Sequence, residues 1–308
     1  MKTKTPTINV SPRFSLRLAP TLVVAAVFIL SVAVQLTYAT PGDLFEADFN
    51  SGNIYQFTPG GTRSTFASGL NSPVGLAFNS AGNLFEGDQG SGNIYEFTPD
   101  GTRSTFASGL AASEGLAFNS GGNLFAADFN SGNIYQFTPG GTRSTFASGL
   151  NEPGGLAFNS AGNLFEGDIG SGNIYQFTPD GTRSTFASGL NSPYGLAFDG
   201  AGNLFVTTFN QPGNIYEFTP GGTRSTFASG LNFPVGLAFN SAGNLFEGDI
   251  GSGNIYEFTP DGTRSTFASG LSPAFLAFEP VPEGSTLGLL AVGAPGLGLV
   301  WVRRMVKA

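Results

Sequence analysis

Acidic residues at a fixed spacing are the first candidates for chemistry. Glu-x-Asp pairs recur about every 40 residues, at Glu46/Asp48, Glu86/Asp88, Glu166/Asp168 and Glu247/Asp249, and Asp128 stands alone at the same place. We expect these side chains to ring one end of the fold. Carboxylates suit Ca²⁺, but Asp also routinely accepts backbone N–H bonds in turns such as Asp-x-Gly-Ser-Gly-Asn. We favour the turn and no cofactor; the alternative is calcium held by Asp48, Asp88, Asp128, Asp168 and Asp249.

Catalysis by the common acid–base or nucleophilic routes finds little support. The sequence has no His and no Cys. The side chain that titrates nearest neutral pH and the thiol nucleophile are therefore both missing. Ser and Thr recur from copy to copy of the repeat, so no hydroxyl is singled out beside a base. The composition favours binding over catalysis.

These residues belong to a unit that repeats through most of the chain. The motif Gly-Asn/Asp-Leu-Phe starts six copies, at 42–81, 82–121, 122–161, 162–201, 202–242 and 243–278. Each copy reads as four short strands bounded by Gly, Pro, Asn or Ser, in the second copy 83–88, 93–98, 102–108 and 115–118. Pro-Asp-Gly or Pro-Gly-Gly joins the middle two, which is a hairpin signal. Four antiparallel strands in each copy are typical of a propeller blade.

The phase of the repeat predicts how the ring closes. The repeats begin with the first strand of a copy, just after Asp43, and end with the Phe-Leu-Ala-Phe run at Phe275–Phe278. If that run is an innermost strand, it completes the blade whose other strands come from 43–68. We expect an all-β, six-bladed β-propeller over 40–280, closed by N- and C-terminal strands that share one blade. The recurrent Phe positions should pack between blades.

The six copies differ from one another mainly at two places. One follows the first strand: Phe49, Gln89, Phe129, Ile169, Phe209 and Ile250. The other precedes the innermost strand: Val74, Glu114, Gly154, Tyr194 and Val235, with Glu152 and Phe233 beside it. Both places fall at the same end of an antiparallel blade. Variation gathered on a rigid scaffold indicates a recognition surface; drift at sterically free positions is the alternative.

The junctions of the repeat resemble a known family. Pro-x-Gly-Leu-Ala-Phe, Gly-Asn-Leu-Phe-x-x-Asp and Asn-Ile-Tyr-x-Phe-x-Pro-Asp-Gly are similar to NHL-type repeats and to gluconolactonase-like and streptogramin-lyase-like propellers, over about 40–278. Those propellers include enzymes and binding modules, so the resemblance implies a fold and not an activity. A lyase of that type would use a catalytic His, which this chain lacks. A metal-dependent hydrolase or lactonase, with Glu, Asn and Asp converging at the channel, is the alternative function.

The first 39 residues carry a targeting pattern. A basic head is followed by an apolar run at 21–34 and by small residues that end at Ala39. This pattern predicts a secretory signal peptide over 1–39, removed by signal peptidase, and an uncleaved anchor is the alternative.

The last 28 residues, 281–308, resemble a PEP-CTERM sorting signal. Pro282, Glu283 and Gly284 are followed by a short apolar segment at 287–302 and by Arg303 and Arg304, although Gly284 stands where that family has Pro. The resemblance implies an exosortase-type processing enzyme, membrane attachment through the tail before processing, and the envelope, surface or extracellular matrix of a Gram-negative bacterium. A plain C-terminal anchor shares the pattern.

The charge of the repeats restricts the partners. Residues 40–282 hold 20 Asp or Glu against six Arg, with no Lys. Such a surface repels nucleic acid and anionic lipid. We therefore predict an exported, surface- or matrix-associated scaffold that binds an extracellular polysaccharide or another protein without catalysis.

Overall fold

The computed structural model describes residues 42–280. The predicted signal peptide, 1–39, and the predicted sorting signal, 281–308, lie outside the described residues. Between residues 42 and 280, no helix is long and apolar enough to cross a membrane.

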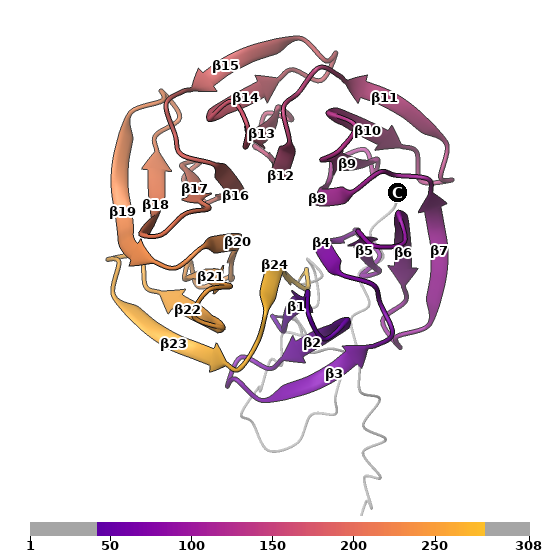
Figure 1. Ribbon diagram of the computed structural model, residues 1–308, viewed down its shortest axis with the longest axis horizontal. Coiled ribbons are helices and arrows are strands. Elements are labelled where there is room, and N and C mark those ends of the chain that lie inside the picture. Colours follow the sequence, from indigo (N-terminus) through magenta and orange to yellow (C-terminus); the bar gives the residue numbers. More distant parts are fainter. Residues whose placement is uncertain (1–41, 281–308) are drawn as a thin grey trace, which may run out of the picture. The chain divides into compact units, whose positions relative to one another are not determined.

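The described chain forms six four-stranded antiparallel sheets arranged as the blades of a ring (Figure 1). From the centre outward, blade 1 contains β24 (Pro273–Phe278), β1 (Leu44–Asp48), β2 (Asn53–Phe57) and β3 (Arg63–Ala67). Blade 2 contains β4 (Pro73–Phe78), β5 (Leu84–Asp88), β6 (Asn93–Phe97) and β7 (Arg103–Ser108). Blade 3 contains β8 (Ser113–Phe118), β9 (Leu124–Asp128), β10 (Asn133–Phe137) and β11 (Arg143–Ala147).

The other three blades repeat this order. Blade 4 contains β12 (Pro153–Phe158), β13 (Leu164–Asp168), β14 (Asn173–Phe177) and β15 (Arg183–Ala187). Blade 5 contains β16 (Pro193–Phe198), β17 (Leu204–Thr208), β18 (Gly213–Phe218) and β19 (Arg224–Leu231). Blade 6 contains β20 (Pro234–Phe239), β21 (Leu245–Asp249), β22 (Asn254–Phe258) and β23 (Arg264–Ser269). The predicted six-bladed propeller is confirmed.

The ring closes through blade 1, as the phase of the repeat predicts. Strand β24 pairs with β1 in antiparallel register, with Leu44 opposite Phe278 and Phe45 opposite Ala277.

The innermost strands begin earlier than expected, at Ser113 and not at residue 115 in blade 3. Consequently the variable positions Glu114 and Tyr194 lie inside β8 and β16 and not before them.

Phenylalanine rings fill the space between blades, which confirms the packing interpretation. The ring of Phe85 in blade 2 meets Phe106 of the same blade and Phe118 of blade 3 edge-on, each with centroids 5.0 Å apart, and Phe106 contacts Phe137 of blade 3 at 5.9 Å. Equivalent contacts recur around the ring, as between Phe205 and Phe227 at 5.0 Å. Edge-to-face geometry matches the quadrupoles of the rings, so each interface is well packed and specifically oriented.

Ending the chain at Ser272 should prevent the ring from closing. The shortened chain lacks β24, so β1 loses its inner partner and two apolar clusters lose the buried side chains Phe275 and Leu276. Each such loss costs about 2–5 kcal/mol, and together they approach the whole stability of a typical domain. Thermal unfolding should show a much lower midpoint or no cooperative transition. A chain ended at Pro280 is the control and should melt normally; equal melting of both chains would contradict shared-blade closure.

Candidate functional site

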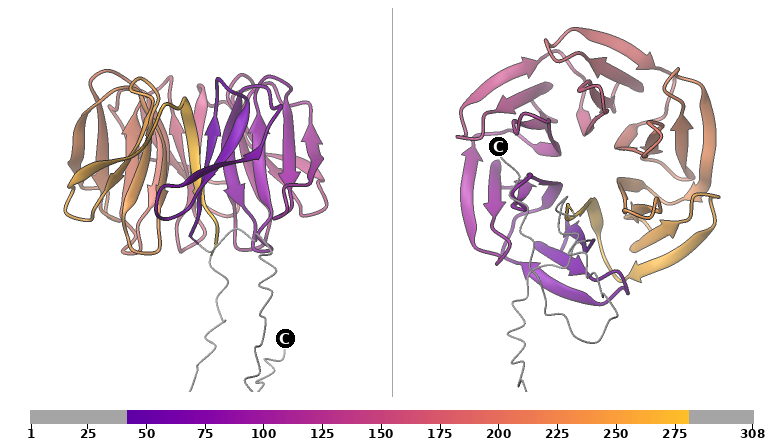
Figure 2. Two further views of the ribbon diagram at one scale, coloured as in Figure 1. Left: turned by 90° about the horizontal axis from the view of Figure 1, so that it is seen from below. Right: turned by 180° about the vertical axis from the view of Figure 1, so that it is seen from behind.

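The two variable regions lie at one end of the propeller, as predicted, and are joined by backbone hydrogen bonds. The N–H of Gln89 donates to Ser72 O at 3.2 Å, that of Ile169 to Glu152 O at 3.2 Å, and that of Phe209 to Ser192 O at 2.8 Å. We call this the variable end. Residues 42 and 280 lie at the other end of the blades, because β1 starts there and β24 finishes there (Figure 2).

A buried carboxyl group joins three of the variable residues. Glu114, only 3% exposed, accepts a hydrogen bond from Gln89 Nε2 at 2.6 Å and one from the Tyr194 hydroxyl at 2.6 Å. Tyr194 belongs to blade 5 and Glu114 to blade 3, so the hydrogen bond spans an intervening blade. That blade has Gly154 at the equivalent position.

The electrostatics of this cluster follow from its burial. Burial raises the pKa of Glu114 to about 7, although the hydrogen bonds from Tyr194 and Gln89 oppose the rise. Burial, followed by the nearby Glu114 charge, also raises the pKa of Tyr194 well above its usual value. Glu114 therefore titrates near neutral pH, while the tyrosine stays protonated and donates.

A chain of aromatic rings runs from the centre of the variable end to its surface. Tyr194 contacts Phe275 at 5.7 Å and Phe209 at 5.4 Å, and Phe209 contacts Phe233 at 5.2 Å between centroids. Phe209 and Phe233 are 37% and 36% exposed, and within 42–280 they are the only exposed large hydrophobic side chains. The inner rings hold them in place, so this is a pre-ordered apolar surface.

Apolar side chains from several blades pack together at this end of the ring. Phe275 of β24 lies in one apolar cluster with Val74 of blade 2 and Val235 of blade 6, and Phe49, Tyr194 and Ile250 pack against it.

The remaining variable residues sit around this aromatic chain. Ile169 lies beside Gly154, where a Cβ atom would come within 2.9 Å of Ile169 Cδ1. Phe129 is partly buried and Glu152 is exposed. Glu152 and Phe233 have φ angles of 57° and 55°, in the left-handed region, but so do Ser72 and Ser192 at the same position in other copies. This strain is therefore part of the shared loop and marks no function of its own.

The aspartates of the Glu-x-Asp pairs act in turns. Asp88 Oδ1 accepts from Ser91 N at 2.9 Å and Oδ2 from Asn71 N at 2.7 Å. Asp48, Asp168 and Asp249 make the same two kinds of bond, and Asp128 accepts from the backbone N–H groups of Ala111 and Ala112. Within the described ranges, no three acidic side chains are grouped to share a metal ion. The structure thus does not bring together the aspartates that the calcium alternative would require.

The glutamates of these pairs lie elsewhere than predicted. We expected them to ring one end of the fold, but Glu46, Glu86, Glu166 and Glu247 are fully buried in β1, β5, β13 and β21, and their carboxyl oxygens have no hydrogen-bond partner. Residues alternate between the two faces of a strand, and both faces of these strands are covered by neighbouring blades. Ala126 and Val206 hold the same position in blades 3 and 5.

Burial raises the pKa of all four glutamates well above the usual value, and the neighbouring aspartates add to the rise while Arg side chains oppose it. For Glu86, the nearby backbone of Val74 also lowers the pKa, with the smallest effect of the four causes, although it makes no hydrogen bond to the carboxyl group. A buried carboxyl group without a partner is least costly when protonated, so these groups favour the neutral form.

We predict that the free energy of unfolding falls as pH rises above the ordinary glutamate pKa of about 4.3, because the unfolded chain then releases protons that the folded chain keeps. Below that pH both states are protonated and the effect is absent. Glu86→Val, which copies Val206, should raise the free energy of unfolding at pH 8, because it removes a group that the folded chain must keep protonated.

Denaturant titrations at pH 4 and pH 8 measure this effect. At pH 4 the gain from Glu86→Val should be much smaller, since the parent carboxyl group is neutral there. Ala126→Val, at the equivalent position of blade 3, introduces the same side chain without removing a carboxyl group, so it is the control and should show no such pH dependence. An equal gain from Glu86→Val at both pH values would show that packing, and not ionisation, is the cause.

Comparison with known proteins supports the fold. No protein-family model matches the sequence, and neither does any curated protein sequence. The propeller of a nidogen/laminin complex is similar, with a TM-score of 0.70 and 21% identity over 77% of this chain and 98% of that chain. This likeness concerns the fold and agrees with the six-bladed β-propeller described above.

Two enzymes have similar folds as well. Virginiamycin B lyase from Staphylococcus aureus matches with a TM-score of 0.63 and 15% identity, over 79% of this chain and 87% of that chain. A gluconolactonase from Xanthomonas campestris matches with a TM-score of 0.62 and 17% identity, over 76% and 89%. At such identities the likeness concerns the fold alone, because one fold carries both binding and catalysis.

Sequence reasoning missed the role of Phe275. The other five innermost strands have glycine at this place: Gly75, Gly115, Gly155, Gly195 and Gly236. Comparison of the six copies shows this replacement of glycine by phenylalanine, which marks the residue that packs at the centre of the ring. Its contact with Tyr194, 81 positions earlier in the chain, could not be read from any single copy.

Proposed function

We propose that this protein is an exported binding module that uses the variable end to hold another protein. The observation that carries the proposal is the exposed pair Phe209 and Phe233, which the aromatic chain through Tyr194 and Phe275 holds in place. Exposed aromatic side chains backed by rigid neighbours are typical centres of protein interfaces. The nidogen/laminin complex includes a propeller of similar fold that functions in protein binding.

The chemistry of this surface favours a protein over a polysaccharide. Sugar hydroxyls require hydrogen-bonding side chains, but Gln89, Glu114 and Tyr194 are already hydrogen-bonded to one another. What the surface offers outward is chiefly apolar ring area, which suits apolar side chains of a partner. The binding experiment below must therefore distinguish a polysaccharide partner from a protein partner.

Several observations support binding over catalysis. The sequence lacks His and Cys. A Staphylococcus aureus virginiamycin B lyase whose histidine is replaced by alanine is described as catalytically inactive, and it too has this fold, with a TM-score of 0.60. The one carboxyl group of the aromatic surface that titrates near neutral pH, Glu114, is enclosed by its two partners. No observation favours the lactonase alternative specifically.

Export and surface association rest on the sequence patterns at 1–39 and 281–308. Under this proposal signal peptidase and an exosortase-type enzyme process the chain, and the tail holds it at the membrane before processing. Residues 42 and 280 lie at the end opposite to the variable end. An attachment through either flanking segment would therefore leave Phe209 and Phe233 accessible to a partner.

We predict that Phe209→Gln and Phe233→Ser weaken partner binding by about tenfold or more each, as expected for aromatic hot spots. Gln89 and Ser72 already occupy these positions in blade 2, so both variants should fold. The partner is first captured from the envelope or extracellular fraction of the native host, and its dissociation constant for residues 40–282 is then measured by calorimetry.

Phe129→Gln makes the same substitution at the equivalent position of blade 3, outside the aromatic chain, and should leave binding nearly unchanged. If both aromatic variants bind like the parent, the variable end is not the interface. If a polysaccharide and no protein binds saturably, the partner class is wrong. Turnover of a lactone by the parent would overturn the non-catalytic role.

A separate prediction concerns processing. Intact-mass analysis of the protein from its native host should give a mature chain that begins at Thr40 and lacks 287–308. Replacement of Arg303 and Arg304 by Gln should impair retention and processing, since these charges follow the apolar segment and favour the cytoplasmic side. A mature chain that still ends at Ala308 would indicate a simple anchor.

A further inference from the structure

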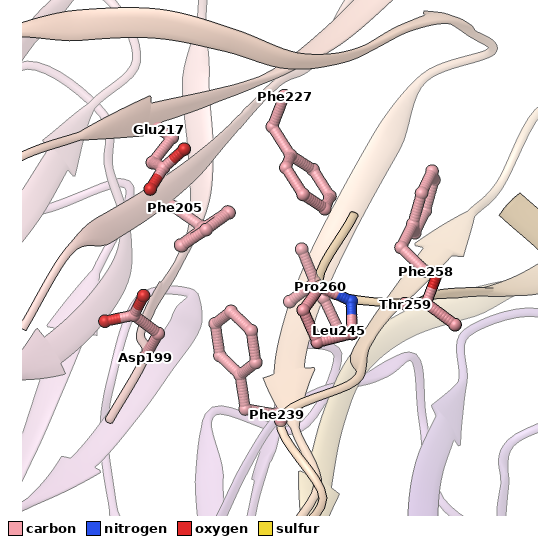
Figure 3. A pocket seen from close by; sticks show the side chains of 10 residues that line it. Asp199, Phe205, Glu217, Phe227, Phe239, Leu245, Phe258, Thr259 and Pro260 are labelled. Carbon is pink, nitrogen blue, oxygen red and sulfur yellow. The ribbon is translucent and has the colours of Figure 1, made fainter. Parts of the chain in front are cut away.

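A cavity of about 110 Å³ lies between blades 5 and 6, at the end opposite to the variable end. Figure 3 shows four phenylalanine side chains around it, Phe205, Phe227, Phe239 and Phe258, with Asp199 and Glu217 on one side. The rings are held by mutual contacts, with centroids 5.0 Å apart for Phe205 and Phe239 and 5.7 Å apart for Phe227 and Phe258. The cavity thus combines fixed apolar walls with two carboxyl groups.

The acidic side of this cavity arises from a departure from the repeat. Asp199 stands where four of the other five copies have asparagine, Asn79, Asn119, Asn159 and Asn240, and the last has Glu279. Like those asparagines, it accepts backbone hydrogen bonds within its turn, from Ala201 N at 2.9 Å and Asn203 N at 2.7 Å. Both of these bonds go to Oδ1, so the second carboxylate oxygen, Oδ2, can accept a hydrogen bond from another group.

That second oxygen changes the hydrogen bonding of Glu217. In blades 2 and 6 the amides of Asn83 and Asn244 donate to Glu96 and Glu257, both at 2.7 Å. In blade 5 the equivalent amide, Asn203 Nδ2, donates to Asp199 Oδ2 at 2.9 Å. The amide that pairs with the glutamate in blades 2 and 6 is thus directed to Asp199 in blade 5, and Glu217 lines the cavity beside Asp199.

We propose that this cavity binds a cationic alkyl group, an ammonium or guanidinium on an aliphatic stem such as a lysine or arginine side chain of a partner protein. The stem would lie against the phenylalanine rings while the cation meets Asp199 and Glu217. Cations are also attracted to aromatic faces. The cavity is smaller than the 300–1,000 Å³ usual for larger ligands, so it matches one side chain.

Residues 42–280 supply no spare cation, so once the flanking segments are removed as proposed above, the occupant comes from another molecule. Residues 42–280 contain no Lys, and all six of their Arg side chains lie over Tyr rings at 4.8–5.0 Å, as Arg224 does over Tyr216. The excess of acidic residues in the same range draws cations toward the protein. This site is independent of the variable end, so either proposal can fail without the other.

The test uses n-butylammonium as the probe and n-butanol as its uncharged match. Binding to residues 40–282 is followed by NMR through the backbone amides of Gly243 and Thr259, which line the cavity. n-Butylammonium should shift these signals saturably. Added salt should weaken its binding, because the carboxylates are partly exposed and their charges are screened. The double variant Asp199→Asn with Glu217→Gln should bind about tenfold more weakly.

Both substitutions restore residues that other copies carry, Asn240 and Gln176, so the double variant should fold normally. Glu257→Gln, the same change at the equivalent position of blade 6, is the matched control and should bind like the parent. If n-butanol binds as tightly as n-butylammonium, the cavity recognises only apolar groups and the proposal is wrong. Equal weakening by Glu257→Gln, or no saturable shift, would also overturn it.

Discussion

The close approach of the innermost strands is the constraint on which the propeller depends. A Cβ atom on Gly75 would lie 1.9 Å from the carbonyl oxygen of Glu114, and one on Gly195 would lie 1.9 Å from that of Val235. Contacts this short are impossible, so a side chain at these positions would push neighbouring blades apart. Glycine in five of six copies lets the ring close tightly, and the sixth copy places Phe275 there, in the apolar cluster at the centre.

Deviation from the repeat is what creates both candidate sites. A perfectly repeated ring would present the same short side chains six times and could recognise little. Glu114 and Tyr194 stand where the other copies have valine, glycine or alanine, and they meet across blade 4. Asp199 replaces one asparagine and diverts one amide, which leaves Glu217 facing a cavity. The repeated core keeps the scaffold rigid enough for such single changes to have local and defined effects.

Strand number, blade order and closure were predictable because they depend on period and phase, and a 40-residue period allows few arrangements. Side-chain environments were less predictable. Glu86 and Asp88 point the same way along one strand, yet the turn satisfies the aspartate while the next blade covers the glutamate. The distinction needs the distance between blades, which no single copy encodes. For the same reason the contact of Phe275 with Tyr194 was not foreseen.

The hydrogen bonding of Glu114 explains how a buried carboxyl group can serve the variable end near neutral pH. When ionised, it accepts from both Gln89 and Tyr194. When protonated, it must donate one bond, and the Tyr194 hydroxyl can rotate to accept while the Gln89 amide still donates. The four core glutamates lack any such partner. Both protonation states of Glu114 therefore preserve the bridge between blades 3 and 5, and the aromatic chain that starts at Tyr194 keeps its support.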